Sequence, residues 1–398
     1  MIKRYLYVIL LGLFVGCNES NRTFEKASYM IDLNLDTLQT EDTVKISAFF
    51  KTVNTIILED HEYAVIGEIH AIQIFEDNIF VLDKWKAKKL FVFDKQGKYL
   101  RQIGDYGQAP GEYLGISDFC IDIQNREIYL LDDNGKKIHK YKIDNGKFMK
   151  SIPLPTDVTC RYIAYFQGDL YCSIRPYDKT NNNLLMKITA SGKYAEYLNA
   201  DKYNAGFNRL LSNGYNFFVS KTEQPRYVEL FMNTVFSFDK DTVYPFVTVM
   251  HKDWVRKGDF LSEEEYMKQQ IIERFDLSRK GRAFTIRNYF EWQDNIFFQY
   301  WHGFGTPLSV LYNKKTGNIC QYKYMKNDLL FQNRTDARFL HVNSTAAYDY
   351  YDSEWFASYY IAENGLISNL DLLPNLDKRE ELIKLQPERF IIFEYVFK

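Results

Sequence analysis

The chain has 398 residues, a formal net charge of −2, and a composition that is 46% hydrophobic, 26% charged and 17% aromatic. These values fit a folded globular protein and exclude collagen-like, intrinsically disordered and disulfide-scaffold classes. A net charge this close to zero gives no nucleic-acid-binding footprint, so no nucleic-acid partner is expected. The aromatic share favours strands over helices, because flat rings pack well on a pleated sheet.

The first residues have the pattern of a bacterial export signal. Lys3 and Arg4 precede an apolar stretch too short to span a bilayer, and Gly16 stands directly before Cys17. Residues 1–17 are therefore predicted to be a lipoprotein signal peptide, cleaved before a lipid-modified Cys17. An ordinary secretory signal or a buried apolar strand is the alternative. An acylated Cys17 carrying more than one chain would anchor the protein stably to the membrane.

Residues 18–42 are expected to be a tether, and residues 43–398 a single domain. No apolar run of 18 residues follows the signal, so no transmembrane helix is expected. The predicted location is the cell envelope, as an outer-membrane lipoprotein on either the periplasmic or the surface face.

Short alternating apolar runs, separated by turn residues, fill the chain from residue 68 to about residue 330, a pattern typical of regularly spaced β-strands. Each unit has a turn with Gly or Asp between two such runs, and the first two turn glycines are 49 residues apart. The successive turns lie at Gly97, Gly146, Gly192, Asp239 and Gly317. A period of about 40 to 50 residues with about four strands per unit predicts a β-propeller.

Two segments interrupt the strand pattern. Ser262 and Glu265 form a capping box, an apolar stripe follows, and Gly281 is a C-cap, so a helical insertion is predicted at about residues 261–281. A second, short helical segment is expected between residues 353 and 386. The chain then ends in an apolar strand.

Five units are complete by residue 325, and the rest of the chain supplies a sixth. The predicted fold class is all-β: a six-bladed β-propeller with an inserted helix and a short C-terminal helical segment before the closing strand. Because an unpaired edge in the last blade would promote aggregation, the closing strand needs a partner near the N-terminus. Thr55–Leu58 and Val44–Phe50 are the two candidates.

The segment Gly104–Tyr113, with the sequence GDYGQAPGEY, resembles the inter-blade linker of the six-bladed β-propeller lipoproteins of Bacteroidetes, which are related to NHL-repeat propellers. The resemblance covers nearly the whole chain, including the signal at Cys17. The family usually has Gly where this chain has Ala109, so the first tight contact of that linker is expected to differ. The resemblance implies an exported, membrane-anchored propeller and carries over no catalytic residue.

The residues of this linker have physical roles that can be stated from the sequence. Gly107 and Gly111 allow a sharp turn, Pro110 fixes its φ angle, and Glu112 could accept hydrogen bonds from backbone amides of the turn. The main interpretation is a linker that positions adjacent blades. The alternative is a ligand-binding role for Glu112 or Tyr113.

The sequence contains none of the common hydrolase, phosphate-binding or dinucleotide-binding motifs, so no catalytic residue, metal ligand or cofactor is assigned. The alternative function is a metal-dependent hydrolase or lyase that uses His and Asp residues of the channel. His70, His139 and His302 are the histidines that a propeller could bring together. The segments Asp132–Gly135 and Asp144–Gly146 resemble parts of calcium loops but are adequately explained as turns.

A few aromatic and polar residues in hairpin loops and strand ends are the candidates for ligand binding, since such loops are held on a rigid scaffold. They are Trp85, Arg175, Tyr177, Trp292, Trp301 and His302. Packing between blades is the competing explanation for the aromatic members.

The predicted function is a membrane-anchored, non-catalytic lipoprotein that binds a ligand or protein partner at a loop face or at the channel mouth. A glycan, a peptide or an envelope protein is the expected partner class. A purely structural envelope protein is a further alternative.

Overall fold

The computed structural model describes residues 30–176, 183–199, 217–218, 225–239, 242–259, 280–303, 305, 307–329, 339–352 and 389–398. The predicted signal peptide with Cys17, nearly all of the predicted helix at 261–281, and the predicted helical segment at 353–386 lie outside this range. In the described part of the chain, no helix is long and apolar enough to cross a membrane.

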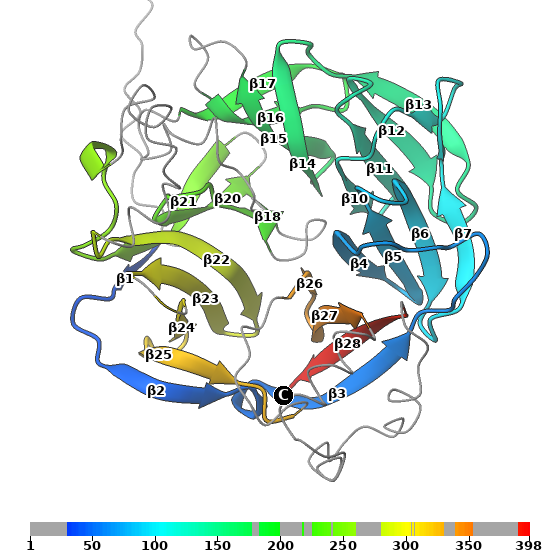
Figure 1. Ribbon diagram of the computed structural model, residues 1–398. Helices are drawn as coiled ribbons and strands as arrows, with labels where there is room; N and C mark the ends of the chain where they lie inside the picture. The colour runs from blue at the N-terminus through cyan, green and yellow to red at the C-terminus, as the bar shows by residue number, and fades with distance from the viewer. Residues whose placement is uncertain are drawn as a thin grey trace, which may run out of the picture.

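Six sheets of four or five strands follow one another around a central axis, so the fold is the predicted six-bladed β-propeller (Figure 1). Blade 1 contains β4 (Ala71–Phe75), β5 (Asn78–Asp83), β6 (Lys89–Asp94) and β7 (Tyr99–Ile103). Blade 2 contains β10 (Asp118–Asp122), β11 (Glu127–Asp132), β12 (Lys137–Lys142) and β13 (Phe148–Pro153). Blade 3 contains β14 (Val158–Phe166), β15 (Asp169–Pro176), β16 (Asn183–Ile188) and β17 (Tyr194–Asn199).

The last three blades each include a strand from the N-terminal segment. Blade 4 contains β18 (Phe217–Phe218), β19 (Arg226–Tyr227), β20 (Thr234–Asp239), β21 (Thr242–Met250) and β1 (Ile31–Asn34). Blade 5 contains β22 (Ala283–Trp292), β23 (Asn295–His302), β24 (Leu308–Asn313), β25 (Ile319–Lys326) and β2 (Thr40–Lys45). Blade 6 contains β26 (His341–Val342), β27 (Ala346–Asp352), β28 (Phe390–Phe397) and β3 (Phe50–Ile57).

Four small elements complete the description. The parallel strands β8 (Asp105–Tyr106) and β9 (Glu112–Tyr113) lie in the linker between blades 1 and 2. Short 3-10 turns occur at Ile46–Ala48 and Lys257–Asp259.

The burial of individual strands explains the sequence pattern. The second strand of a blade packs against neighbouring blades on both faces, so β11 is buried along its whole length and reads as a continuous apolar run. The outermost strands have one face in solvent, and most of β13 is exposed or half-buried. Continuous apolar runs therefore mark the interior strands, whereas the outer strands mix polar and apolar residues.

The turns that define the sequence period lie where they are expected, between the third and fourth strands of blades 1 to 5. Gly97, between β6 and β7, shows why glycine is needed at such a turn. Its φ is +85°, and an added Cβ would come within 2.1 Å of the carbonyl oxygen of Ile57. That close approach lets the carbonyl of Gly97 accept a 2.7 Å hydrogen bond from the backbone N–H of Glu59, which fastens the turn to the chain that follows β3.

The ring is closed by pairing between the two ends of the chain. β28 lies between β27 and β3, and its antiparallel register with β3 runs from Ile391 opposite Ile57 to Phe397 opposite Phe50. In Figure 1 the red and blue ends of the chain lie side by side in this blade. The prediction that an N-terminal strand completes the last blade is confirmed.

The predicted tether at 18–42 requires a correction. Residues 31–34 form β1, which pairs in parallel with β21, and residues 40–45 form β2, which pairs in parallel with β25. Both strands are polar, and each buries few side chains, Leu33 in β1 and Val44 in β2. Because they add to outer edges of existing sheets, they need no alternating apolar pattern, and the sequence pattern therefore did not reveal them.

Aromatic rings fill the seam between blade 5 and the closing blade. The Trp292 ring stacks on Phe397 with centroids 5.3 Å apart and planes 4° apart, and Phe397 also stacks on Phe50 at 4.9 Å. Trp292 is only 6% exposed, because Phe49 and Phe290 enclose it on other sides. This burial corrects the prediction of Trp292 as a ligand-binding residue and makes it part of the ring closure.

Replacing Phe397 by Ala should lower the free energy of unfolding by about 3–5 kcal/mol, because it removes a buried ring from the seam and leaves a cavity. Tyr63→Ala is the control, because the Tyr63 side chain is 64% exposed, and it should change stability by less than about 0.5 kcal/mol. Urea unfolding followed by circular dichroism measures both. Equal midpoints for Phe397→Ala and the unaltered protein would show that the seam does not stabilise the ring.

Candidate functional site

One face of the ring carries two kinds of connection. Because the four strands of a blade alternate in direction, the second strand ends at the edge where the linker from the preceding blade enters. The loops between second and third strands and the inter-blade linkers therefore share a face, called the loop face below.

Most of the predicted ligand-binding residues belong to the second strands or to the loops that follow them. They are Trp85 after β5, Arg175 and Tyr177 at and after the end of β15, and Trp301 and His302 at the end of β23. Tyr177 and the side chain of Arg175 lie outside the described residues. The repeat thus brings residues from blades 1, 3 and 5 to one face.

A buried aspartate at the end of β5 holds the loop face together at blade 1. The Asp83 carboxylate accepts hydrogen bonds from the backbone N–H groups of Gly67 at 2.8 Å, Glu68 at 3.0 Å and Lys86 at 2.9 Å. It therefore joins the incoming linker to the loop between β5 and β6. A carboxylate with this many backbone donors is strongly held, and it fixes the position of the loop around it.

Blade 2 repeats the same device 49 residues later. The Asp132 carboxylate accepts bonds from the N–H groups of Leu114 at 2.9 Å and Gly135 at 2.8 Å. The next residue, Asp133, accepts from the N–H of Cys160 at 2.8 Å and from Lys136 at 2.9 Å. These oxygens serve the loop and its neighbours, which favours the interpretation of the Asp132–Gly135 segment as a turn over a calcium loop.

The linker after β7 is folded onto its own residues. Glu112 accepts a 2.8 Å bond from the N–H of Ala109, and Gly107 donates its N–H to the carbonyl of Tyr113 at 3.0 Å. Tyr113 is fully buried in the core shared by blades 1 and 2, and this burial raises the pKa of its hydroxyl well above the usual value. Pro110 is exposed at the tip. The contacts of this linker are those of a spacer between blades.

Gly111 of that linker packs closely against blade 2. Its φ is +88°, and an added Cβ would lie 2.7 Å from the Phe148 ring. Its carbonyl accepts a 2.7 Å bond from the Tyr141 hydroxyl of blade 2.

The loop after β5 presents an exposed aromatic ring among lysines. Trp85 is 62% exposed, and the Lys84 ammonium lies 4.8 Å from its ring centroid. Lys86 and Lys88 are also exposed, and the Lys88 ammonium lies 6.0 Å from the ring of Tyr106, which is 63% exposed. These five residues are called the blade 1 loop surface below.

The second aromatic candidate is less accessible. Trp301 is half-buried and packs against the core of blades 4 and 5, and the Arg287 guanidinium lies 5.5 Å from its ring. The next residue, His302, instead contacts His251 and Asp253, which lie in the linker that follows blade 4.

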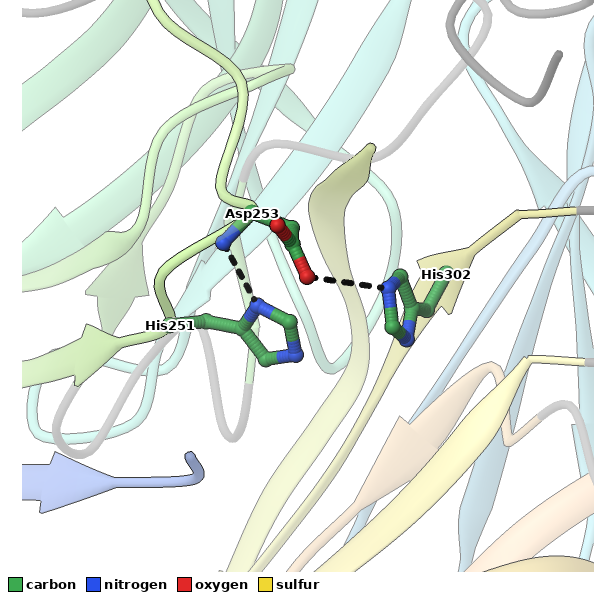
Figure 2. Close-up of side chains that lie close together, drawn as sticks. All are labelled: His251, Asp253 and His302. Atoms are coloured by element: carbon green, nitrogen blue, oxygen red, sulfur yellow. Dashed lines mark hydrogen bonds and ion pairs between the residues drawn. The ribbon is translucent and has the colours of Figure 1, made fainter. Parts of the chain in front are cut away.

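His251, Asp253 and His302 form the cluster shown in Figure 2, with one potential ligand atom from each lying within 4.8 Å of the others. Asp253 donates its backbone N–H to Nδ1 of His251 at 3.1 Å, and its Oδ2 lies 3.7 Å from Nε2 of His302. The two imidazole rings meet edge to face with centroids 4.7 Å apart. Within the described residues, this is the only group of three or more His, Cys, Asp or Glu side chains at such distances.

The backbone around the cluster is regular. The carbonyl of Asp253 accepts a 2.9 Å bond from the N–H of Ala283, and Ala283 lies opposite His302 in the antiparallel pair of β22 and β23. Burial, together with the neighbouring His302, lowers the pKa of His251 and so favours its neutral form.

The predicted combination of His70, His139 and His302 is not formed. His139 lies inside blade 2, where its Nδ1 is 3.0 Å from the Ser151 hydroxyl and its Nε2 is 3.5 Å from the Asp132 carboxylate. His70 lies in blade 1, with its ring centroid 6.4 Å from that of Trp85. The structure instead brings His302 to His251 and Asp253, which sequence reasoning missed. The short spacing His-x-Asp in a linker was the only signal available.

With its described strands forming six blades around one axis, the protein is a six-bladed β-propeller whose loop face carries the candidate sites. The chain belongs to the family described as a domain of unknown function, DUF4934, whose model matches residues 28–388.

The fold is similar to that of a Bacteroides fragilis NCTC 9343 protein whose name calls it exported, with a TM-score of 0.64, 18% identity, and coverage of 93% of this chain and 100% of that one. A DUF4221 family member from Bacteroides vulgatus has a TM-score of 0.49 and 9% identity, over 88% of this chain and 97% of that one. At these identities the likeness concerns the fold alone. A comparison with curated proteins gives no match.

Replacing Gly111 by Ala should lower the free energy of unfolding by about 2–4 kcal/mol, because strain at positive φ adds to the clash with Phe148. The control is Gly192→Ala, since Gly192 has a similar φ of +78° and nothing within 4 Å of an added Cβ. That variant should lose only about 1 kcal/mol. Equal losses in urea unfolding would contradict the tight packing of the linker against blade 2.

Proposed function

We propose that the protein is a membrane-anchored, non-catalytic lipoprotein of the cell envelope that binds an acidic glycan on the blade 1 loop surface. Two features support the envelope location: the signal that ends at Cys17 and the similarity to a Bacteroides fragilis protein named as exported. Lipidation of Cys17 would leave the propeller in aqueous surroundings at the end of a short tether, with the loop face available to a ligand.

The observation that carries the proposal is the exposure of Trp85 on a rigid loop. The Trp85 ring is 62% exposed, so its apolar surface stays in contact with water unless a ligand covers it, and covering it is favourable. The loop that carries it is fixed by the backbone bonds to Asp83, so little conformational entropy would be lost on binding.

The chemistry of the surface points to a sugar ligand with negative charge. A flat indole face stacks on the apolar face of a sugar ring, and Tyr106 offers a second ring on the adjacent linker. Three lysines, Lys84, Lys86 and Lys88, give the surface a local positive charge in a chain whose overall charge is slightly negative. Carboxylated or sulfated sugars match both properties.

A glycan array containing acidic and neutral sugars, followed by calorimetric titration of the best ligand, tests the proposal. Trp85→Ala should weaken binding by at least about tenfold, because it removes the stacking platform. Lys86→Ala should weaken binding of acidic glycans by a smaller factor, and high salt should reduce the difference. Tyr194→Ala is the control, since Tyr194 is an exposed aromatic residue on the outer strand of blade 3.

Two results would contradict the proposal. Unchanged affinity in Trp85→Ala would remove the blade 1 loop surface as the site, and binding of acidic peptides but no glycans would change the ligand class. A turnover rate on any glycan or peptide that disappears on mutation of a loop-face residue would favour the alternative of a hydrolase or lyase.

A further inference from the structure

We propose that His251, Asp253 and His302 bind a divalent transition-metal ion of the zinc class where the linker from blade 4 enters blade 5. The inference is independent of the proposed glycan binding, which concerns blade 1. Two imidazoles and one carboxylate are a donor set that suits zinc and similar ions, whereas calcium and magnesium prefer oxygen-rich sites.

The distances require only small side-chain movements. Bond lengths of about 2.0–2.2 Å in a tetrahedral site put neighbouring ligand atoms about 3.3 Å apart. The observed 3.7 Å between Nε2 of His302 and Oδ2 of Asp253 is close to that value, and one ligand atom from each of the three residues lies within 4.8 Å of the other two. Rotation of side chains on a fixed backbone would close the remaining difference.

The orientation of His251 leaves one nitrogen available. Nδ1 accepts the N–H of Asp253, and Figure 2 shows the second ring nitrogen on the side of the ring that faces His302. Coordination through Nε2 places the ring proton on Nδ1 and therefore releases the bond from the N–H of Asp253. Metal binding is thus expected to change the tautomer of His251, which gives a spectroscopic signature.

The cluster is rigid enough to be preorganised and open enough to admit an ion. Hydrogen bonds through Ala283 tie the backbone of Asp253 to β22, while the side chains of His302 and Asp253 are 33% and 36% exposed. Among charged neighbours, Asp36 accepts a 2.8 Å bond from the N–H of Lys252 and adds negative charge beside the site, which the Lys252 ammonium partly offsets. Three protein ligands leave a fourth position for water or a ligand atom.

The linker into blade 1 has the same histidine turn without an aspartate, so the local turn does not require the Asp253 side chain. There His61 accepts the N–H of Tyr63 on Nδ1 at 3.2 Å, and Ala64 donates to the carbonyl of His61 at 2.8 Å. The same pattern occurs at His251, where Trp254 donates to the carbonyl at 2.9 Å. At blade 1, however, Tyr63 replaces the aspartate. The two turns therefore share a backbone but only the second has the ligand set.

The full-length protein, stripped with a chelator, would be titrated with Zn²⁺ and separately with Co²⁺. We expect one ion per chain, a Co²⁺ absorption spectrum of nitrogen and oxygen ligation, and no displacement by a large excess of Ca²⁺ or Mg²⁺. His302→Ala and Asp253→Asn should each weaken Zn²⁺ binding at least about tenfold. His61→Gln is the matched control and should bind Zn²⁺ as the unaltered protein does.

Circular dichroism confirms that each variant is folded. If a variant does not fold, ¹⁵N spectra of the histidine rings in the unaltered protein test the site instead. Zn²⁺ should shift the signals of His251 and His302 and leave that of His61 in place. Absence of Zn²⁺ binding, equal weakening by His61→Gln, or unshifted His251 and His302 signals would overturn the proposal.

Discussion

Pairing of β3 with β28 is the constraint on which the rest of the molecule depends. The last blade contains strands from both ends of the chain, so the two ends cannot separate without breaking the β3–β28 ladder. The N-terminal segment does more than close the ring: β1, β2 and β3 lie in turn on blades 4, 5 and 6. One stretch of chain thereby holds three consecutive blades, and the aromatic seam of Trp292 and Phe397 lies beneath it.

Closure keeps the blades together, and at blades 1 and 2 the incoming linker is also bonded to the loop between the second and third strands. Asp83 and Asp132 use buried carboxylates to join an incoming linker to the loop of the same blade. These bonds would lose their geometry if neighbouring blades separated. Both candidate sites depend on this rigidity: the blade 1 loop surface through Asp83, and the histidine cluster through the pairing of Asp253 with Ala283. The protein can therefore present loops with little cost in conformational entropy.

The sequence predicted those parts of the fold that repeat. Turn glycines such as Gly97 and Gly146, both at positive φ, marked the period, and the number of repeating units along the chain indicated six blades. It did not predict β1 and β2, whose polar residues add to existing edges. The prediction of Trp292 as a ligand-binding residue was wrong, because the same local sequence, an aromatic residue with polar neighbours, occurs both in cores between blades and in binding loops. His251 and His302 lie 51 positions apart and meet only through the register of β22 and β23, which no local pattern encodes.

Hydrogen–deuterium exchange of the full-length protein, read by mass spectrometry, tests ring closure most directly. If the N-terminal strand closes the ring, peptides from β28 should exchange as slowly as those from the interior strand β11, and peptides from β3 no faster than those from the outer strand β13, because only the β3 amides that face β28 are paired. Peptides from β3 that exchange as fast as the exposed loop at Trp85, while β28 stays protected, would contradict the account.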